Sequence, residues 1–240
     1  MRHAASCLSI LEWDYGHAKS VREMKCIDKN NNPLPWYTYP AIEYLDQLDL
    51  HDRIIFEYGI GYSTLFWSTR VKGVYGVEND EEWFRRISNQ LGNENIHIRL
   101  KTDTEGYINA VNSWDQKYDI IVVDAEMEGD PGRVKCARAA LASLKEDGVI
   151  ILDNSDWYVD AAGLLRDSGM IQVDMSGFGP INDYTWTTSL YFSRKWTCYP
   201  KNQQQPVHGI GAKKYIRRGS ASKEKTALVH MALKSLISRE

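Results

Sequence analysis

Short apolar runs alternate with amphipathic stretches from Arg53 onward, and this alternation constrains the fold more than any other feature of the chain. The run 119–123 is apolar almost throughout, as parallel strands covered on both faces tend to be. The expected strands occupy residues 54–56, 74–77, 96–100, 119–123, 149–152, 170–175 and 188–192. The expected helices occupy residues 41–50, 63–70, 81–91, 107–114, 134–144 and 159–168.

The repeated strand–helix unit predicts a parallel sheet with helices on both faces, because each crossover connection must be right-handed. Only a loop separates the last two expected strands, so the seventh strand should run antiparallel to the sixth. The prediction is an α/β, Rossmann-like fold with a seven-stranded, mostly parallel sheet and an antiparallel last strand. Such sheets bind ligands at the carboxyl ends of their strands.

The length of 240 residues, 43% of them hydrophobic, suits one sizeable α/β core rather than two full domains. Residues 1–50 lack the alternation, so we expect an N-terminal cap segment there and the main domain at 51–196. Residues 197–240 form a basic C-terminal tail, with helical periodicity only at 227–237.

Charged residues make up 25% of the chain and the net charge is −3, which favours neither a disordered chain nor a general nucleic-acid binder. No apolar run is long enough to span a bilayer, and the N-terminus lacks the features of a secretory signal. The 4 cysteines are far apart and include no CxxC pair, which indicates free thiols. A cytoplasmic location is therefore expected.

A glycine turn, Glu57-Tyr58-Gly59-Ile60-Gly61-Tyr62-Ser63-Thr64, follows the first expected strand and opens a helix. Its glycines allow a tight turn and the close approach of a ligand to the backbone. The helix start adds free N–H groups. A dinucleotide fingerprint would carry a third glycine where Thr64 stands, and no Gly-Lys-Ser/Thr of a P-loop follows. These departures disfavour NAD and P-loop chemistry.

Glu78 ends the second expected strand, 78 − 59 = 19 residues after Gly59. A carboxylate at that spacing can accept both hydroxyls of a ribose. An acidic residue at a strand end is usually a solvated loop residue, and only its spacing from the glycine turn points to ligand binding.

The glycine turn followed by an acidic strand end resembles the cofactor-binding motifs of class I S-adenosylmethionine-dependent methyltransferases. The resemblance extends to residues 122–125 and 148–154 and covers about residues 53–196. Residues 33–40 are similar to the lead-in of a bacterial subgroup of that superfamily. The resemblance to the superfamily implies a methyltransferase that uses S-adenosylmethionine.

The resemblance also implies a set of cofactor-binding residues. Gly59 and Gly61 would lie under the methionine part, Glu78 would hold the ribose, and Asn79 and Asp103 would lie near the adenine, with Thr102 beside them. An alternative for Asp103 is the N-cap of the following helix. The full expected set is Glu57, Gly59, Gly61, Ser63, Glu78, Asn79, Asp103 and Asp124.

Asp124, Asp153 and Asn154 follow two expected strands and are the predicted catalytic residues. They resemble the Asp and Asp-Asn ligands of metal-dependent catechol-type O-methyltransferases, which implies Mg²⁺ or another divalent cation. Met127 departs from that family, whose members usually carry a lysine there. In the metal-free alternative, Asp124 contacts substrate or cofactor while Asp153 and Asn154 cap the next segment.

We expect the acceptor to be a hydroxyl of a small molecule or glycan, because aromatic residues gather around the predicted site. They are Trp36, Tyr37, Tyr39, Trp157, Tyr158, Tyr184 and Trp186. Loop 177–184 could close over them, and Asp124, Asp153 and His208 are the candidate bases. The alternatives are a nucleic-acid methyltransferase, although its usual motifs are missing, and a ligand-binding module without catalysis.

The tail carries two basic pairs, Lys213-Lys214 and Arg217-Arg218, between glycine-containing stretches. One interpretation is a solvated tail, which such charge runs usually form. The other is that these cations recruit an anionic acceptor or pack on a second subunit, which would make the protein a homo-oligomer.

Overall fold

The computed structural model describes residues 2–125 and 130–213 of the chain. Its elements belong to the first of two compact units, Met1–Ile210, and the second unit is Gly211–Glu240. The predictions for Met127, Lys214, Arg217 and Arg218 and for a helix at 227–237 lie outside the described residues.

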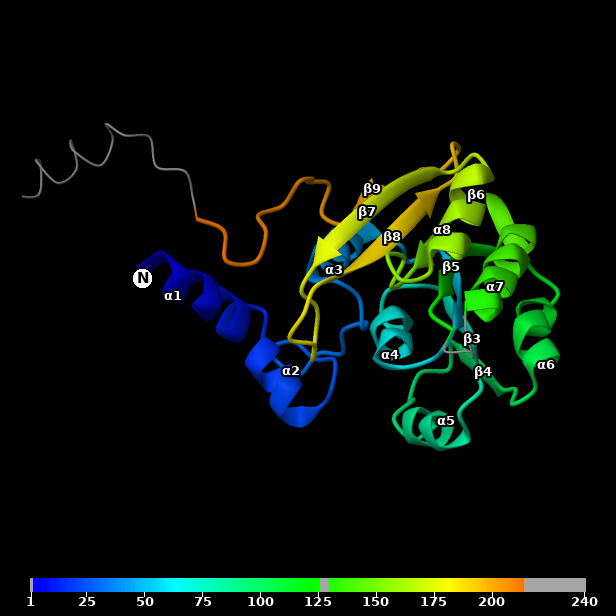
Figure 1. Cartoon of the computed structure of the whole chain (residues 1–240), viewed down its shortest axis with the longest axis horizontal. Coiled ribbons are helices and arrows are strands. Elements are labelled where there is room, and N and C mark those ends of the chain that lie inside the picture. Colours follow the sequence, from blue (N-terminus) through cyan, green and yellow to red (C-terminus); the bar gives the residue numbers. More distant parts are fainter. Residues whose placement is uncertain (1, 126–129, 214–240) are drawn as a thin grey trace, which may run out of the picture. The chain divides into compact units, whose positions relative to one another are not determined.

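One sheet of 7 strands organises the described part of the first unit, in the order β4-β3-β2-β5-β6-β8-β7. Its strands are β2 (Ile54–Tyr58), β3 (Gly73–Glu78), β4 (Ile96–Leu100), β5 (Tyr118–Val123), β6 (Leu144–Leu152), β7 (Ile171–Gly177) and β8 (Trp186–Phe192). β8 is antiparallel to both β6 and β7, and the other pairings are parallel. The predicted fold class is therefore confirmed (Figure 1).

Six helices connect or flank these strands within the described residues, close to the predicted positions. They are α3 (Tyr39–Asp46), α4 (Tyr62–Ser68), α5 (Glu81–Ser88), α6 (Thr104–Asn109), α7 (Asp130–Ser143) and α8 (Val159–Asp167). A 3₁₀ turn, η2 (Ala110–Asn112), continues α6. α7 and α8 lie against each other (Figure 1).

The N-terminal segment contains helices that the sequence analysis did not predict. They are α1 (Arg2–Ser9), a π-helical turn η1 (Ile10–Asp14) and α2 (His17–Glu23). α2 begins after Gly16, which has φ 80°, and ends before Met24, which has φ 50°. A two-residue strand β1 (Leu48–Asp49) pairs with β9 (Tyr199–Pro200), which joins the start of the tail to the end of the cap segment.

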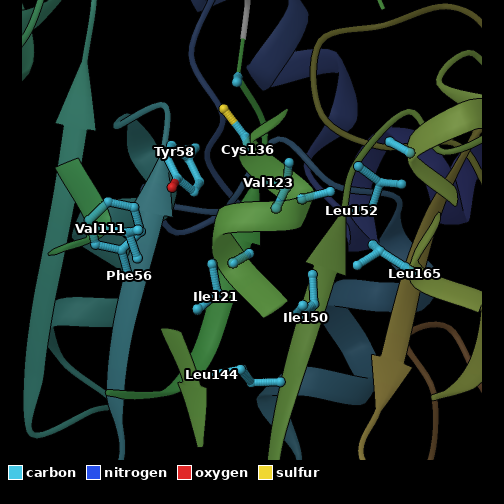
Figure 2. Packing of buried hydrophobic residues seen from close by; sticks show 14 of the residues in the cluster. Phe56, Tyr58, Val111, Ile121, Val123, Cys136, Leu144, Ile150, Leu152 and Leu165 are labelled. Carbon is cyan, nitrogen blue, oxygen red and sulfur yellow. The ribbon is translucent and has the colours of Figure 1, made fainter. Parts of the chain in front are cut away.

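The central strands bury both faces, which explains their continuous apolar character. Ile121 and Val123 of β5 pack in one core layer with α6, α7 and α8, while Ile120 and Val122 pack in the other with α3 and α4. Figure 2 shows the first layer, with Ile150 and Leu152 of β6 near Leu165 and with Cys136 near Tyr58 and Val123. Alternating side chains point to opposite faces of a strand, so one apolar run serves both layers.

Within the described residues, no helix is long and apolar enough to cross a membrane. The cysteines are all free: Cys26 and Cys136 are buried, Cys7 is exposed, and Cys198 is half-buried.

Candidate functional site

The predicted site residues follow strands that are neighbours in the sheet. Tyr58 at the end of β2 is level with Val77 of β3 on one side and with Val123 of β5 on the other. Val123 is in turn level with Leu152 at the end of β6. The glycine turn, Glu78, Asp124 and Asp153 therefore reach the same carboxyl edge.

The two glycines of the turn have different physical reasons to be glycine. Gly59 has φ 87°, and a Cβ there would lie 2.6 Å from the carbonyl oxygen of Asp124. Gly61 is extended, and its Cβ would meet only the Trp83 ring, at an ordinary 3.6 Å. The fold itself therefore requires glycine at position 59, whereas at position 61, which is buried, an added Cβ would make only an ordinary contact.

Thr64, which replaces the third glycine of a dinucleotide fingerprint, ties the turn together. Its hydroxyl donates to Glu57 Oε2 at 2.7 Å and accepts from the backbone N–H of Gly61 at 3.1 Å. The side chain is fully buried. Its hydroxyl thus builds a hydrogen-bonded turn where a glycine would allow close helix–strand packing.

Glu57 lies beneath the glycine turn and is completely buried. Burial raises the pKa of its carboxyl to about 8; the charge of Asp124 adds to the rise, and the Ser63 and Thr64 hydroxyls offset part of it. Its Oε1 has no hydrogen-bond partner among the described residues. A buried acceptor without a partner costs about 1–3 kcal/mol. A cationic or hydrogen-bonding ligand group would relieve that cost.

Glu78 connects the end of β3 to the glycine turn. Its Oε1 accepts from the backbone N–H groups of Asn79 at 2.8 Å and Asp80 at 3.0 Å. Its Oε2 accepts from the N–H of Ile60 at 3.2 Å. Burial raises the pKa of Glu78, and these backbone donors oppose the rise. A carboxylate has about four acceptor positions, so one remains for a ligand hydroxyl.

Asp103 is the N-cap of α6, since its Oδ1 accepts from the N–H of Gly106 at 2.6 Å. The capping alternative is therefore observed. The side chain is exposed and lies after β4, the strand next to β3. The predicted roles of Asp103 and Asn79 near the adenine therefore stay predictions.

Asp153 directs its carboxylate toward β8. Its Oδ1 accepts from Trp186 Nε1 at 3.1 Å and from the Thr188 hydroxyl at 2.5 Å. The residue is 3% exposed, and burial together with the charge of Asp124 raises its pKa well above the ordinary value. Asn154 has φ 52° and begins the turn that leads to α8, where its carbonyl oxygen accepts from the N–H of Tyr158 at 3.1 Å.

Arg133 of α7 is a site residue that sequence reasoning missed. Its guanidinium is buried and donates to Asp124 Oδ1 at 3.3 Å. The only sequence signal is an arginine at the start of the helix that follows β5. Nothing in the sequence specified that this side chain turns back over the strand end.

The cap segment is fixed to the same edge through Thr38. Its backbone N–H donates to the Thr188 hydroxyl at 3.0 Å, and its own hydroxyl donates to the Met175 carbonyl oxygen at 2.7 Å. Tyr37 is buried beside it, and its hydroxyl has no partner among the described residues. Burial, together with the charges of Glu57 and Asp124, raises the pKa of Tyr37 well above its ordinary value.

Loop 178–185, which joins β7 to β8, packs against the cap. The Phe178 carbonyl oxygen accepts from the N–H of Tyr39 at 2.7 Å, and the Gly179 carbonyl oxygen lies 3.1 Å from His17 Nδ1. A Cβ at Gly179 would lie 2.3 Å from the Tyr37 carbonyl oxygen. Only a residue without a side chain fits in this closed arrangement.

The predicted aromatic cluster divides into two groups. Tyr37, Tyr39 and Trp186 are buried in the core, whereas Trp36 is 44% exposed. Trp157, at 54% exposure, and Tyr184, at 44%, have ring centroids 6.0 Å apart, and Tyr184 lies 6.0 Å from Trp186. We call Trp157 and Tyr184 the aromatic ledge. Tyr158 is half-buried beneath Arg133.

Comparisons with known proteins agree with this architecture. No protein-family model matches the sequence, and no curated protein matches it. Precorrin-6y C5,15-methyltransferase from Geobacter metallireducens GS-15 is similar in structure, with a TM-score of 0.50 and 14% identity. The match covers 64% of this chain and 87% of that chain.

Two further solved structures are similar. SMU.1697c from Streptococcus mutans, in complex with SAH, gives a TM-score of 0.47 at 16% identity over 62% of this chain and 94% of that chain. An rRNA methylase from Streptococcus thermophilus gives 0.45 at 16% identity over 64% and 96%. The fold of the chain is that of class I S-adenosylmethionine-dependent methyltransferases.

Proposed function

We propose that this protein is an S-adenosylmethionine-dependent methyltransferase. The observation that carries the proposal is the glycine turn at the end of β2, where φ 87° and a close backbone contact require glycine at position 59. Glu57 adds a buried oxygen without a partner, and Glu78 adds a carboxylate with one acceptor position left. All three are at the edge where such sheets bind ligands.

The donor would be held by the chain's own polar groups. Glu57 and Ser63 suit the amino-acid part, since Glu57 is buried without a cationic partner and Ser63 lies at the start of α4. Glu78 suits a ribose hydroxyl, with Asn79 and Asp103 on the side of the adenine. When bound, the donor supplies an electrophilic methyl group on a sulfonium.

The acceptor we propose is a hydroxyl of a small molecule or glycan. Its oxygen attacks the methyl carbon, the bond from that carbon to sulfur breaks, and the hydroxyl proton passes to a base. Asp124 is the proposed base, because its side chain is 33% exposed whereas Asp153 is buried and hydrogen-bonded to β8. The aromatic ledge offers exposed flat surfaces to a planar ring or a sugar.

The test uses the full chain with a methyl-labelled donor and three acceptor classes: phenols and catechols, nucleotide sugars and glycans, and RNA. We expect the label to move to an oxygen of the first or second class. Asp124→Asn should stop transfer but keep donor binding, whereas Asp167→Asn, at a side chain 78% exposed, should change neither transfer nor donor binding. Transfer only to RNA would favour the nucleic-acid alternative, and donor binding without transfer the non-catalytic module.

A further inference from the structure

Three oxygen atoms at the ends of β5 and β6 converge on one side chain. Arg133 Nη1 donates to the carbonyl oxygen of Val123 at 2.9 Å, to that of Asp153 at 3.2 Å and to Asp124 Oδ1 at 3.3 Å. Nη2 also donates to Asp124 Oδ1, at 3.3 Å. Two backbone carbonyls and a carboxylate form a cation site, and a guanidinium fills it.

This guanidinium is held firmly in place. The Arg133 side chain is 4% exposed, and its Cζ lies 4.1 Å from the centroid of the Tyr158 ring. A buried cation is tolerated only where it is paired and hydrogen-bonded, and here the carboxylate of Asp124 supplies the opposite charge. The Asp124 side chain is 33% exposed, so it lies between the buried cation and the accessible side of the site.

The same geometry does not fit a divalent metal held by Asp124, Asp153 and Asn154. Asp124 and the two carbonyls already accept from Arg133, and a second cation among them would meet charge repulsion. The Asp153 carboxylate accepts from Trp186 and Thr188 on the neighbouring strand. Among the described residues, no group of three His, Cys, Asp or Glu side chains could hold a metal ion. The misfit rests on the hydrogen-bond partners of the two aspartates.

We propose that Arg133 is the built-in cation of this site: it takes the place of a divalent metal, neutralises Asp124 from the buried side and fixes its orientation toward the acceptor. The inference that Asp124 faces an acceptor rests on the proposed methyltransferase function. The inference that no divalent metal binds at Asp124 is independent of that function. Arg133 is thus a positioning residue for Asp124.

The first experiment titrates Mn²⁺ into the full chain and measures bound ion by electron paramagnetic resonance. We expect the wild-type protein and Asp124→Asn to show the same weak, nonspecific binding. A stoichiometric Mn²⁺ site in the wild type that Asp124→Asn abolishes would overturn the proposal. Neither measurement needs the Arg133 variant to fold or the acceptor to be known.

The second experiment removes the guanidinium. Arg133→Ala should unfold at a lower temperature, and ethylguanidinium should restore part of the loss, with no such effect on wild type or on Arg138→Ala, an exposed arginine of the same helix. Arg133→Ala should also gain Mn²⁺ binding that the double variant with Asp124→Asn lacks. A folded Arg133→Ala that responds to neither cation would refute the idea of a cation site.

The two proposals fail in different ways. If the protein binds no S-adenosylhomocysteine, the methyltransferase function fails while the Mn²⁺ result still decides the role of Arg133. If the donor binds and a specific Mn²⁺ site is found at Asp124, only the inference on Arg133 fails.

Discussion

The proposed donor half of the carboxyl edge (residues 57–64 and Glu78) and the proposed acceptor half (Thr38, Asp153 and Thr188) are held together over different distances in the sequence. In the donor half, the backbone N–H of Gly61 donates to the Thr64 hydroxyl, 3 residues away in the sequence. The N–H of Ile60 donates to the carboxylate of Glu78, 18 residues away. In the acceptor half, the backbone N–H of Thr38 donates to the Thr188 hydroxyl, 150 residues away in the sequence. The donor half is a nearly local structure, whereas the acceptor half forms only when the cap, β6 and β8 come together.

The largest effect expected in the donor half comes from Gly59→Ala. A Cβ there meets a backbone oxygen at 2.6 Å in a residue with φ 87°, so the turn must shift. We expect a loss of about 3 kcal/mol in the free energy of unfolding, together with loss of donor binding. Gly92→Ala is the control, since a Cβ there has nothing within 4 Å. Urea titration gives the free energy of unfolding of both variants. Equal values for Gly59→Ala and Gly92→Ala would mean that the turn does not require glycine at position 59.

In the acceptor half, Thr188→Val should loosen the N-terminal cap segment without affecting the donor half. It removes the hydroxyl that joins Thr38 to Asp153 and leaves both without this partner, at a cost of about 2 kcal/mol. Amide exchange in the cap should speed up while donor affinity stays the same. Thr187→Val, which loses only an exposed bond to Ser176, is the matched control. If Thr188→Val weakens donor binding as much as it loosens the cap, the two halves are one unit.

The buried carboxyl of Glu57 predicts a pH dependence of stability. Its pKa is about 8 in the folded chain against 4.5 ordinarily, so between these values the folded state holds a proton that the unfolded state has lost. Stability should therefore fall as pH rises through this window, by up to about 1.4 kcal/mol per pH unit from this group. Glu57→Gln should make the decline shallower. An unchanged decline in urea titrations across the window would show that Glu57 ionises normally.

The smallest expected effect distinguishes a helix N-cap role from a ligand contact at Asp103. Asp80 and Asp103 both cap helices, accepting from Trp83 N and Gly106 N at 2.6 Å each. Replacing either with alanine should cost about 1 kcal/mol of stability. Only Asp103→Ala should also weaken donor binding, as measured by calorimetry. Equal donor affinity in the two variants would leave Asp103 with the capping role alone.

The contrast between the halves also explains what the sequence could predict. The strand–helix alternation predicted the confirmed fold class, and the glycine turn is built from residues close in sequence. The role of Arg133 could not be predicted from its place at the start of a helix, because that role depends on two strand ends that meet only in the folded sheet. Tyr37 and Trp186 were expected at the pocket mouth but are buried, since aromatic content alone does not distinguish a rim from a core. The functional roles of the site residues remain predictions.

Calorimetric titration decides whether the edge built by Gly59, Gly61 and Glu78 binds the methyl donor. S-adenosylhomocysteine should bind the wild-type chain, and NAD should not. Glu78→Ala should weaken S-adenosylhomocysteine binding by about 1–3 kcal/mol, because a ribose hydroxyl loses its acceptor. Tight binding of NAD with no response to S-adenosylhomocysteine would contradict the account.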